Sequence, residues 1–129
     1  MARRAADLDR ADLAFLAERH LATLTTLRPD GSPHVVAVGF SYDPADEVAR
    51  VITFADSRKA RHAATGGRAA VCQVDGRRWL TLEGTVRLVT DAAGVAGAVT
   101  RYAARYRPPK ERTDRVALEI AVDRVLGHG

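Results

Sequence analysis

Positive side chains crowd the point where a strand-like segment gives way to a short helix. Arg58, Lys59 and Arg61 follow Ser57, a residue type that caps helix N-termini. Because that end of a helix already carries partial positive charge, each exposed cation there opposes the macrodipole by roughly 0.3 to 1 kcal/mol. A bound anion attracts the cations, the free backbone N–H groups and the serine hydroxyl together. The sequence therefore predicts an anion site at this position.

Residues on the preceding strand belong to the same prediction. We expect Arg50 and Thr53 to reach the anion as well. The alternative interpretation is a solvated surface helix, with Asp56 offsetting part of the charge. Lys59 is one of only two lysines among the 20 cationic side chains. The lysine ammonium is a compact, rotatable charge, whereas the arginine guanidinium is planar. A retained lysine is therefore a candidate ligand for the anion.

Other residues with binding or reactive side chains are isolated along the chain. Trp79, the only tryptophan, follows Arg77 and Arg78, and it suits the core and a stacking surface for a planar ligand equally well. His34 opens a strand, where a surface histidine is the usual case. Cys72 is the single cysteine, which excludes an internal disulfide, and its strand-like surroundings favour a buried small hydrophobe. The four histidines lack metal-ligand spacing, so we expect no metal.

Length and charge limit the class of protein. A chain of 129 residues is expected to form one domain, residues 1–129, around a single core. No apolar run is long enough for a membrane span or a signal peptide, which predicts a cytoplasmic protein without a membrane partner. The net charge of +4 suits an anionic ligand. Nucleic acid is disfavoured, because no aromatic residues interleave the arginines and no helix-turn-helix pattern occurs.

Hydrophobic periodicity and turn signals predict an α+β fold. Tight turns at 28–31 and 75–76 join apolar segments as hairpins, and Gly84 is a candidate bulge. Strands joined in this way form an antiparallel sheet, which we expect to close into a six-stranded barrel with flanking helices. The expected strands are 20–27, 34–42, 48–54, 68–74, 79–89 and 116–122, and the expected helices are 8–19, 58–64 and a third that starts after Asp91 and stops before Pro108.

Four stretches, in order, resemble the split-barrel flavoproteins of the pyridoxamine 5'-phosphate oxidase type. They are LAERHLATLTTLRPDGSPHVVAVGFSYD, ARVITFADSRKA, CQVDGRRWLTLEGTV and RYAARYRPPKERTDRVALEIAVDRVLG. More narrowly, they resemble the actinobacterial branch that uses the deazaflavin coenzyme F420. The resemblance covers the chain from about Asp12 to Gly127, and the high arginine and alanine content suits an actinobacterial source.

The resemblance implies a homodimer of six-stranded, FMN-binding-type split barrels, with two cofactors held in grooves between the subunits. It also implies roles for three groups of residues. The phosphate and acidic tail of the cofactor lie at the predicted anion site, near Arg50, Thr53, Ser57, Arg58, Lys59 and Arg61. The deazaflavin ring lies along the backbone of His34, Val35, Val36, Ala37 and Val38. The pocket is completed, from the same or the partner subunit, by Gln73, Arg78 and Trp79.

The activity implied by the resemblance is hydride transfer from reduced F420 to a conjugated small-molecule acceptor such as biliverdin. The cofactor carries the hydride, and the protein holds the cofactor in position and sets the electrostatic field around it. No residue is marked by its sequence position as a proton donor. Two alternatives remain: an FMN-dependent oxidase or flavin reductase of the same fold, and a non-catalytic protein that binds F420 or a tetrapyrrole. Arg58 and Arg61 favour F420 over FMN, because F420 has the longer acidic tail.

Overall fold

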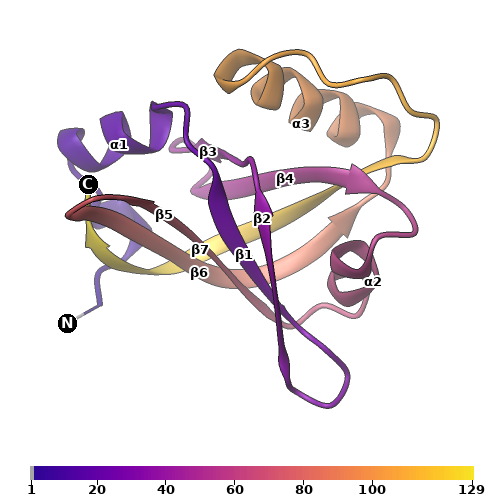
Figure 1. Ribbon diagram of the computed structural model, residues 1–129, viewed down its shortest axis with the longest axis horizontal. Helices are drawn as coiled ribbons and strands as arrows, with labels where there is room; N and C mark the ends of the chain where they lie inside the picture. The colour runs from indigo at the N-terminus through magenta and orange to yellow at the C-terminus, as the bar shows by residue number, and fades with distance from the viewer. Residues whose placement is uncertain (1) are drawn as a thin grey trace.

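The structure, a computed structural model, describes residues 2–129 and contains one antiparallel sheet flanked by helices (Figure 1). The helices are the 3-10 helix η1 (Ala5–Asp7), α1 (Arg10–Ala17), α2 (Arg58–Ala64) and α3 (Ala92–Arg105). The strands are β1 (Ala22–Leu27), β2 (Pro33–Val38), β3 (Ser41–Asp43), β4 (Val48–Phe54), β5 (Arg68–Asp75), β6 (Arg78–Val89) and β7 (Arg115–His128). The predicted α+β class and antiparallel sheet are confirmed.

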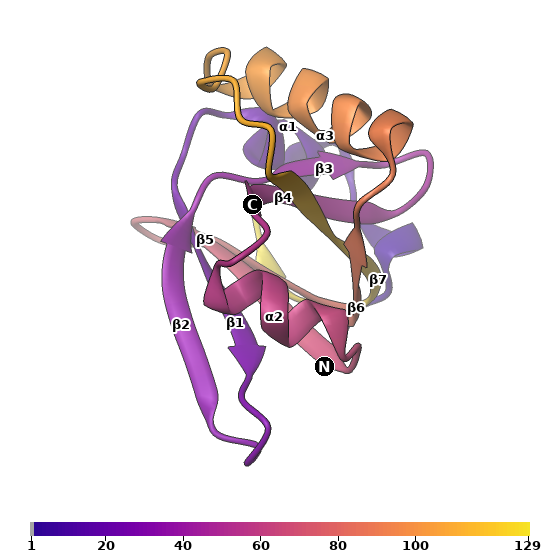
Figure 2. The same ribbon diagram turned by 90° about the vertical axis from the view of Figure 1, so that its right-hand side faces the viewer.

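The strands follow the order β2-β1-β5-β6-β7-β4-β3 across the sheet. β2 and β3 therefore form its two edges, and the curled sheet stays open between them (Figures 1 and 2). β7 stands between β6 and β4, and its pairing with β6 extends from Ala117 to His128. The last strand is consequently longer than the predicted 116–122, because β6 offers a partner along its whole length.

The sequence predicted six strands, whereas the structure has seven. The expected strand 34–42 is divided into β2 and β3 by Gly39 and Phe40. At Gly39 an added Cβ would lie 3.0 Å from the ring of Tyr106, so any other residue would require this ring to shift. The Phe40 N–H donates to the Tyr106 hydroxyl at 3.2 Å instead of to a neighbouring strand. Tyr106, which directly follows α3, thus interrupts the strand.

Helix starts follow from capping side chains. Asp9 accepts a hydrogen bond from the Asp12 N–H at 2.8 Å, so α1 begins at Arg10 rather than at the predicted Leu8. Ser57 accepts from the Ala60 N–H at 3.2 Å, and α2 has the predicted bounds.

None of the helices in residues 2–129 has the length and apolarity needed to cross a bilayer.

The core fills the inside of the curved sheet. Its largest fully buried side chains are Phe15, Phe40, Leu24, Leu80, Leu82, Leu118 and Ile120. The pairing of β6 with β7 shifts register between Glu83 and Gly84, which confirms the predicted bulge. An added Cβ at Gly84 would lie 1.8 Å from the Ala121 carbonyl oxygen, so the close approach of the two strands requires glycine.

The end of α3 is fixed over the open side of the sheet by Arg105. Its guanidinium donates to the carbonyl of Glu18 at 2.8 and 2.6 Å and also to the carbonyl of Phe40. The Tyr106 hydroxyl donates to the carbonyl of His20 at 2.6 Å. These bonds join α3 to the end of α1 and to the connection between β2 and β3.

Candidate cofactor site at the start of helix α2

The turn from β4 into α2 holds two buried hydroxyls. Thr53 and Ser57 are 4% and 6% exposed, and the Thr53 hydroxyl donates to the Ser57 hydroxyl at 3.0 Å. The Ser57 oxygen also accepts the helix-capping bond from Ala60. The two hydroxyls share one hydrogen bond, so one hydroxyl proton of the pair has no acceptor within residues 2–129. That proton is available to an anion.

Lys59 is the most distinctive charge at this turn. Its side chain is half-buried, and this burial lowers its pKa. No carboxylate of the described chain lies within ion-pair distance of Lys59 or of the exposed Arg58. Arg61 lies 3.8 Å from Asp56, but both side chains are exposed and such a pair contributes little. The surface-helix interpretation therefore accounts for Arg61 and leaves Arg58 and Lys59 without partners. Thr53, Ser57, Arg58 and Lys59 are called the anion corner below.

Strand β2 faces this corner through a pair of histidines. The rings of His34 on β2 and His62 on α2 meet edge to face, with centroids 5.1 Å apart and an interplanar angle of 79°. His62 Nδ1 is hydrogen-bonded to the Thr26 hydroxyl at 2.8 Å. His34 Nδ1 is buried and has no partner among the residues that the structure describes. A buried polar atom without a partner is costly in a folded protein and indicates a place for a ligand atom.

The charges around His34 are positive. Burial lowers its pKa most, and His62, Arg28, Arg58 and Lys59 lower it further. The free protein therefore holds His34 neutral near pH 7. The structure thus brings His34 close to the cations of the anion corner.

The segment that follows His34 has two faces. Val35 and Ala37 are exposed on the outer face of the sheet, whereas Val36 is half-buried and Val38 is buried on the inner face. Its backbone forms the free edge of the sheet, because β1 is the only strand neighbour of β2. A planar ligand can therefore reach this backbone from the edge.

Arg50 does not lie at the anion corner, and its predicted role there is corrected. Arg50 and Thr53 are three residues apart on β4, so their side chains point to opposite faces of the sheet. The Arg50 guanidinium forms ion pairs with Asp43 at 3.2 Å and Glu119 at 3.3 Å. Its positive charge is therefore already balanced within the fold.

The side chain of Gln73 is likewise occupied by hydrogen bonds inside the protein. It is fully buried, its amide nitrogen donates to the carbonyl of Phe15 at 2.8 Å, and its amide oxygen accepts from Arg105. It offers no free group to a ligand in this chain. The neighbouring Trp79 is 42% exposed, and its ring lies against Gly127.

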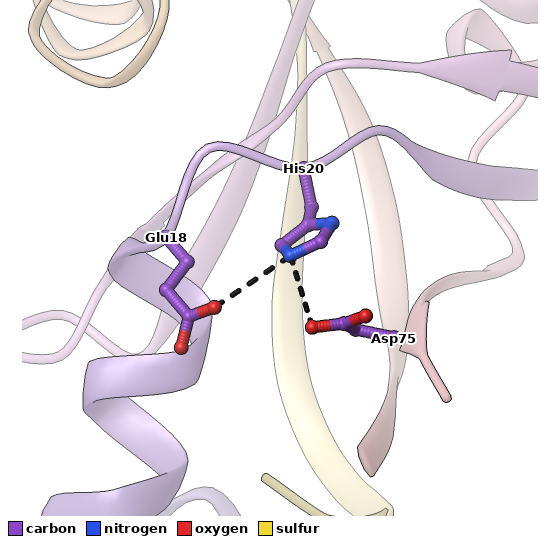
Figure 3. A group of neighbouring side chains, drawn as sticks. All are labelled: Glu18, His20 and Asp75. Atoms are coloured by element: carbon purple, nitrogen blue, oxygen red, sulfur yellow. Dashed lines mark ion pairs between the residues drawn. The ribbon is translucent and has the colours of Figure 1, made fainter. Parts of the chain in front are cut away.

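Arg78 belongs to a charged cluster that the sequence analysis missed. His20 Nε2 lies 3.6 Å from Glu18 and 3.5 Å from Asp75 (Figure 3). Arg78 donates to Glu18 at 2.6 and 3.0 Å and also to Asp75. Its hydrogen bond lowers the pKa of Glu18. The guanidinium of Arg78 already pairs with both carboxylates, so these oxygens have partners without a metal ion. Asp75 and Arg78 lie more than 50 residues along the chain from Glu18 and His20, so histidine spacing does not reveal the cluster.

Large apolar side chains lie exposed on the outer face of the sheet. Leu21 is 69% exposed, Val35 56%, Val74 58% and Trp79 42%, and together they are called the apolar patch. Val74 pairs with Trp79 across β5 and β6, and Leu21 precedes the first residue of β1. Leu21, Val74 and Trp79 are therefore neighbours at one end of the sheet, whereas Val35 pairs with Thr25, four residues along the chain from Leu21.

Comparisons with known proteins agree on one family. The family model described as pyridoxamine 5'-phosphate oxidase matches residues 8–129. An F420H(2)-dependent biliverdin reductase of Mycobacterium tuberculosis is 56% identical over 115 residues, which are 89% of this chain and 84% of that protein.

Solved structures of similar shape support the same grouping. An F420 reductase superposes with a TM-score of 0.72 at 26% identity, over 92% of this chain and 98% of that one. A conserved hypothetical protein of Mycobacterium tuberculosis superposes with a TM-score of 0.76 at 23% identity, over 95% of this chain and 87% of that one. The second similarity establishes the fold alone.

Proposed function

Because the chain belongs to the pyridoxamine 5'-phosphate oxidase family, we propose that it is an F420H2-dependent oxidoreductase that reduces a conjugated acceptor of the biliverdin type. The observation that carries the proposal is the 56% identity over 115 residues with an F420H(2)-dependent biliverdin reductase. Identity at this level, over most of both chains, favours the same cofactor and acceptor class.

The anion corner fits an acidic cofactor. Lys59 and Arg58 lack carboxylate partners in the described chain, and the Thr53–Ser57 pair keeps a free hydroxyl proton. His34 Nδ1 is buried without a partner at the facing strand. A phosphate offers several acceptor oxygens and negative charge. It can therefore accept hydrogen bonds from these groups and balance the charge of the two cations. Arg61 lies one turn further along α2, where it is available to an acidic tail.

When bound, reduced F420 supplies the hydride. The chain's own residues bind and orient it. Lys59 would hold the phosphate by charge, and its half-burial would strengthen that attraction because the local dielectric is lower than in water. The backbone of β2, at the free edge of the sheet, would lie along the ring. No residue is marked by its sequence position as the proton donor, and we assign that step to solvent.

We also infer that the protein is a homodimer, with the apolar patch as the subunit interface. Monomeric proteins seldom expose several large apolar side chains next to one another. Association with a second copy removes Leu21, Val35, Val74 and Trp79 from water. The same face lies beside β2, so a partner subunit that covers it also approaches the proposed ring site. The family resemblance, which implies cofactors between the subunits, supports this arrangement.

Titration with F420 and with FMN tests the proposal. Purified protein is titrated with each cofactor while fluorescence is followed, and biliverdin is then added to the protein loaded with reduced F420. We expect F420 to bind with a dissociation constant in the micromolar range or below, on the order of −8 kcal/mol or better. Its affinity should fall with added salt, because charged contacts are screened. Addition of biliverdin should oxidise the reduced cofactor.

Each alternative gives a different result. Tight FMN binding without a response to F420 identifies a flavin-dependent oxidase or reductase and overturns the proposal. F420 binding without oxidation by biliverdin or related acceptors identifies a cofactor or tetrapyrrole binder. The absence of binding to either cofactor refutes the assignment of the anion corner.

A further inference from the structure

Three side chains from three different elements meet next to the anion corner. Thr26 lies on β1, His34 lies on β2 and His62 lies on α2, the helix that packs against β1 (Figure 2). Thr26 and His34 are directly opposite each other in the pairing of β1 with β2, so their side chains share the inner face of the sheet. His62 approaches this pair from the helix.

Thr26 fixes the ring of His62. The Thr26 side chain is only 1% exposed, and its hydroxyl is hydrogen-bonded to His62 Nδ1 at 2.8 Å. A hydrogen bond at one ring nitrogen holds the orientation of an imidazole and influences its tautomer. Because the hydroxyl is buried, water does not readily replace it as the partner of this nitrogen. The ring of His62 is therefore held in one position against the sheet.

His62 in turn limits the ring of His34. The two rings meet edge to face, with centroids 5.1 Å apart and an interplanar angle of 79°. In this arrangement the positive edge of one ring lies against the electron-rich face of the other. Rotation of the His34 ring would lose that contact, so the contact selects one orientation of His34.

The selected orientation leaves His34 Nδ1 buried and without a hydrogen-bond partner in residues 2–129. Lys59 and His62 are three residues apart on α2, so these half-buried side chains lie on the same side of the helix. Lys59 and Arg58 are among the charges that lower the pKa of His34, so both cations lie near its ring. A ligand that is bound by Lys59 is therefore also close to His34.

We propose that Thr26 and His62 are positioning residues for cofactor binding, and that they hold the imidazole of His34 so that its Nδ1–H donates to a phosphate oxygen of F420. The inference rests on the proposed function, which places that phosphate beside Lys59. The phosphate of F420 is a diester, which is ionised at neutral pH and only accepts hydrogen bonds. Neutral His34 must therefore carry its proton on Nδ1 in the complex. Thr26 and His62 act through His34.

A double-mutant cycle on F420 affinity tests whether Thr26 acts through His34. Thr26→Val keeps the shape of the side chain and removes the hydroxyl, so we expect F420 to bind roughly three- to tenfold more weakly. In a His34→Gln background the same substitution should change the affinity by less than about twofold, because the residue through which it acts is gone. Thr26→Ser keeps the hydroxyl and should bind F420 as the unchanged protein does. Equal losses in the two backgrounds overturn the proposal.

His62→Phe supplies a second cycle that does not depend on the folding of Thr26→Val. It keeps an aromatic ring beside His34 and loses the nitrogen that is bonded to Thr26. We expect it to weaken F420 binding when His34 is present and to have little effect in the His34→Gln background. A loss of the same size in both backgrounds indicates a role in stability alone and also overturns the proposal.

NMR spectra of isotope-labelled histidine rings report the position of the proton directly. Under mildly alkaline conditions, the complex of the unchanged protein with F420 should show the proton of His34 on Nδ1, whereas Thr26→Val should show a mixture of the two tautomers. Identical His34 spectra for the two complexes, or a proton on Nε2 in the unchanged protein, overturn the proposal and leave the proposed function standing. The absence of F420 binding by the unchanged protein refutes the proposed function and this inference with it.

Discussion

The ring of His34 stands edge-on to the ring of His62 with the centroids 5.1 Å apart, and this contact joins the free edge of the sheet to helix α2. Burial lowers the pKa of His34, and His62 and the nearby cations lower it further. A phosphate at Lys59 offsets these positive charges. It therefore raises the pKa of His34 and links cofactor binding to the uptake of a proton.

The first prediction is that F420 binds more tightly as the pH falls from 8 to 5.5. His34 is neutral in the free protein, and its pKa rises on binding, so the complex holds more protons than the free protein and is favoured at low pH. His34→Gln should flatten this dependence. Fluorescence titrations at constant ionic strength measure the F420 affinity of the unchanged protein and of His34→Gln at each pH. Protonation of F420 itself affects both proteins equally, so the difference between them reports on His34. Equal slopes for the two proteins would contradict the prediction.

Lys59 should contribute more to cofactor affinity than the only other lysine. Lys59→Ala removes a half-buried charge that has no partner in the described chain, and we expect F420 affinity to fall roughly ten- to hundredfold. Lys110→Ala is the matched control and should change F420 affinity less than twofold, because Lys110 lies between α3 and β7, outside the anion corner. Titrations in low and high salt should show a smaller salt dependence for Lys59→Ala. Equal losses in the two variants would refute the assignment.

The interface should depend on the apolar patch. Val74→Asp introduces a charge where Val74 faces Trp79, and burial of that charge between subunits is costly. Sedimentation analysis should therefore show the unchanged protein as a dimer and Val74→Asp as a monomer. Ala93→Asp on the exposed surface of α3 should leave the dimer intact. If Val74→Asp sediments as the unchanged protein does, the interface lies elsewhere.

Asp12 should stabilise the fold above about pH 4. Its side chain is 1% exposed and accepts hydrogen bonds from Arg3 at 2.7 Å, Gly129 at 2.9 Å and Asp9 at 3.0 Å. Burial acts to raise its pKa, but these bonds outweigh burial and hold the pKa well below its usual range.

Asp12→Asn removes the charge at nearly constant shape. At pH 7 we expect it to lower the free energy of unfolding by about 2 to 3 kcal/mol, measured by urea denaturation. A carboxylate with a lowered pKa stabilises the protein above its unfolded pKa and loses this effect as the pH falls, so the deficit should shrink below about pH 4. Asp56→Asn, at an exposed aspartate, should change stability by less than about 0.5 kcal/mol. A deficit that does not change with pH would contradict the electrostatic explanation.

Local signals in the sequence were sufficient for some elements. Ser57 fixes the start of α2, and two glycines with positive φ, Gly66 and Gly67, follow its end, so both bounds were predicted correctly. β4 also has its predicted bounds, Val48–Phe54. In each case the side chains that set the bounds lie within a few residues of the element. Sequence patterns predict element bounds well over this short range.

Partners from distant segments explain the errors. Arg50 was assigned to the anion because of its type, yet Glu119 is its neighbour across β4 and β7 and takes up its charge. The period of two along a strand already placed Arg50 and Thr53 on opposite faces, so this signal was present and was not applied. Gln73 is held by Phe15 and Arg105, and the break at Gly39 is imposed by Tyr106. No local pattern reveals these contacts.

The position of β7 has a consequence for how the chain folds as it is synthesised. The group β2-β1-β5-β6 and the group β4-β3 are joined in the sheet only through β7, although every strand of both groups precedes it in the chain. Until residues 115–128 leave the ribosome, β6 and β4 each keep an unpaired backbone edge, which is prone to pair with other chains. Joining of the two groups of strands into one sheet is therefore a late event, and the nascent chain is most vulnerable to aggregation just before it.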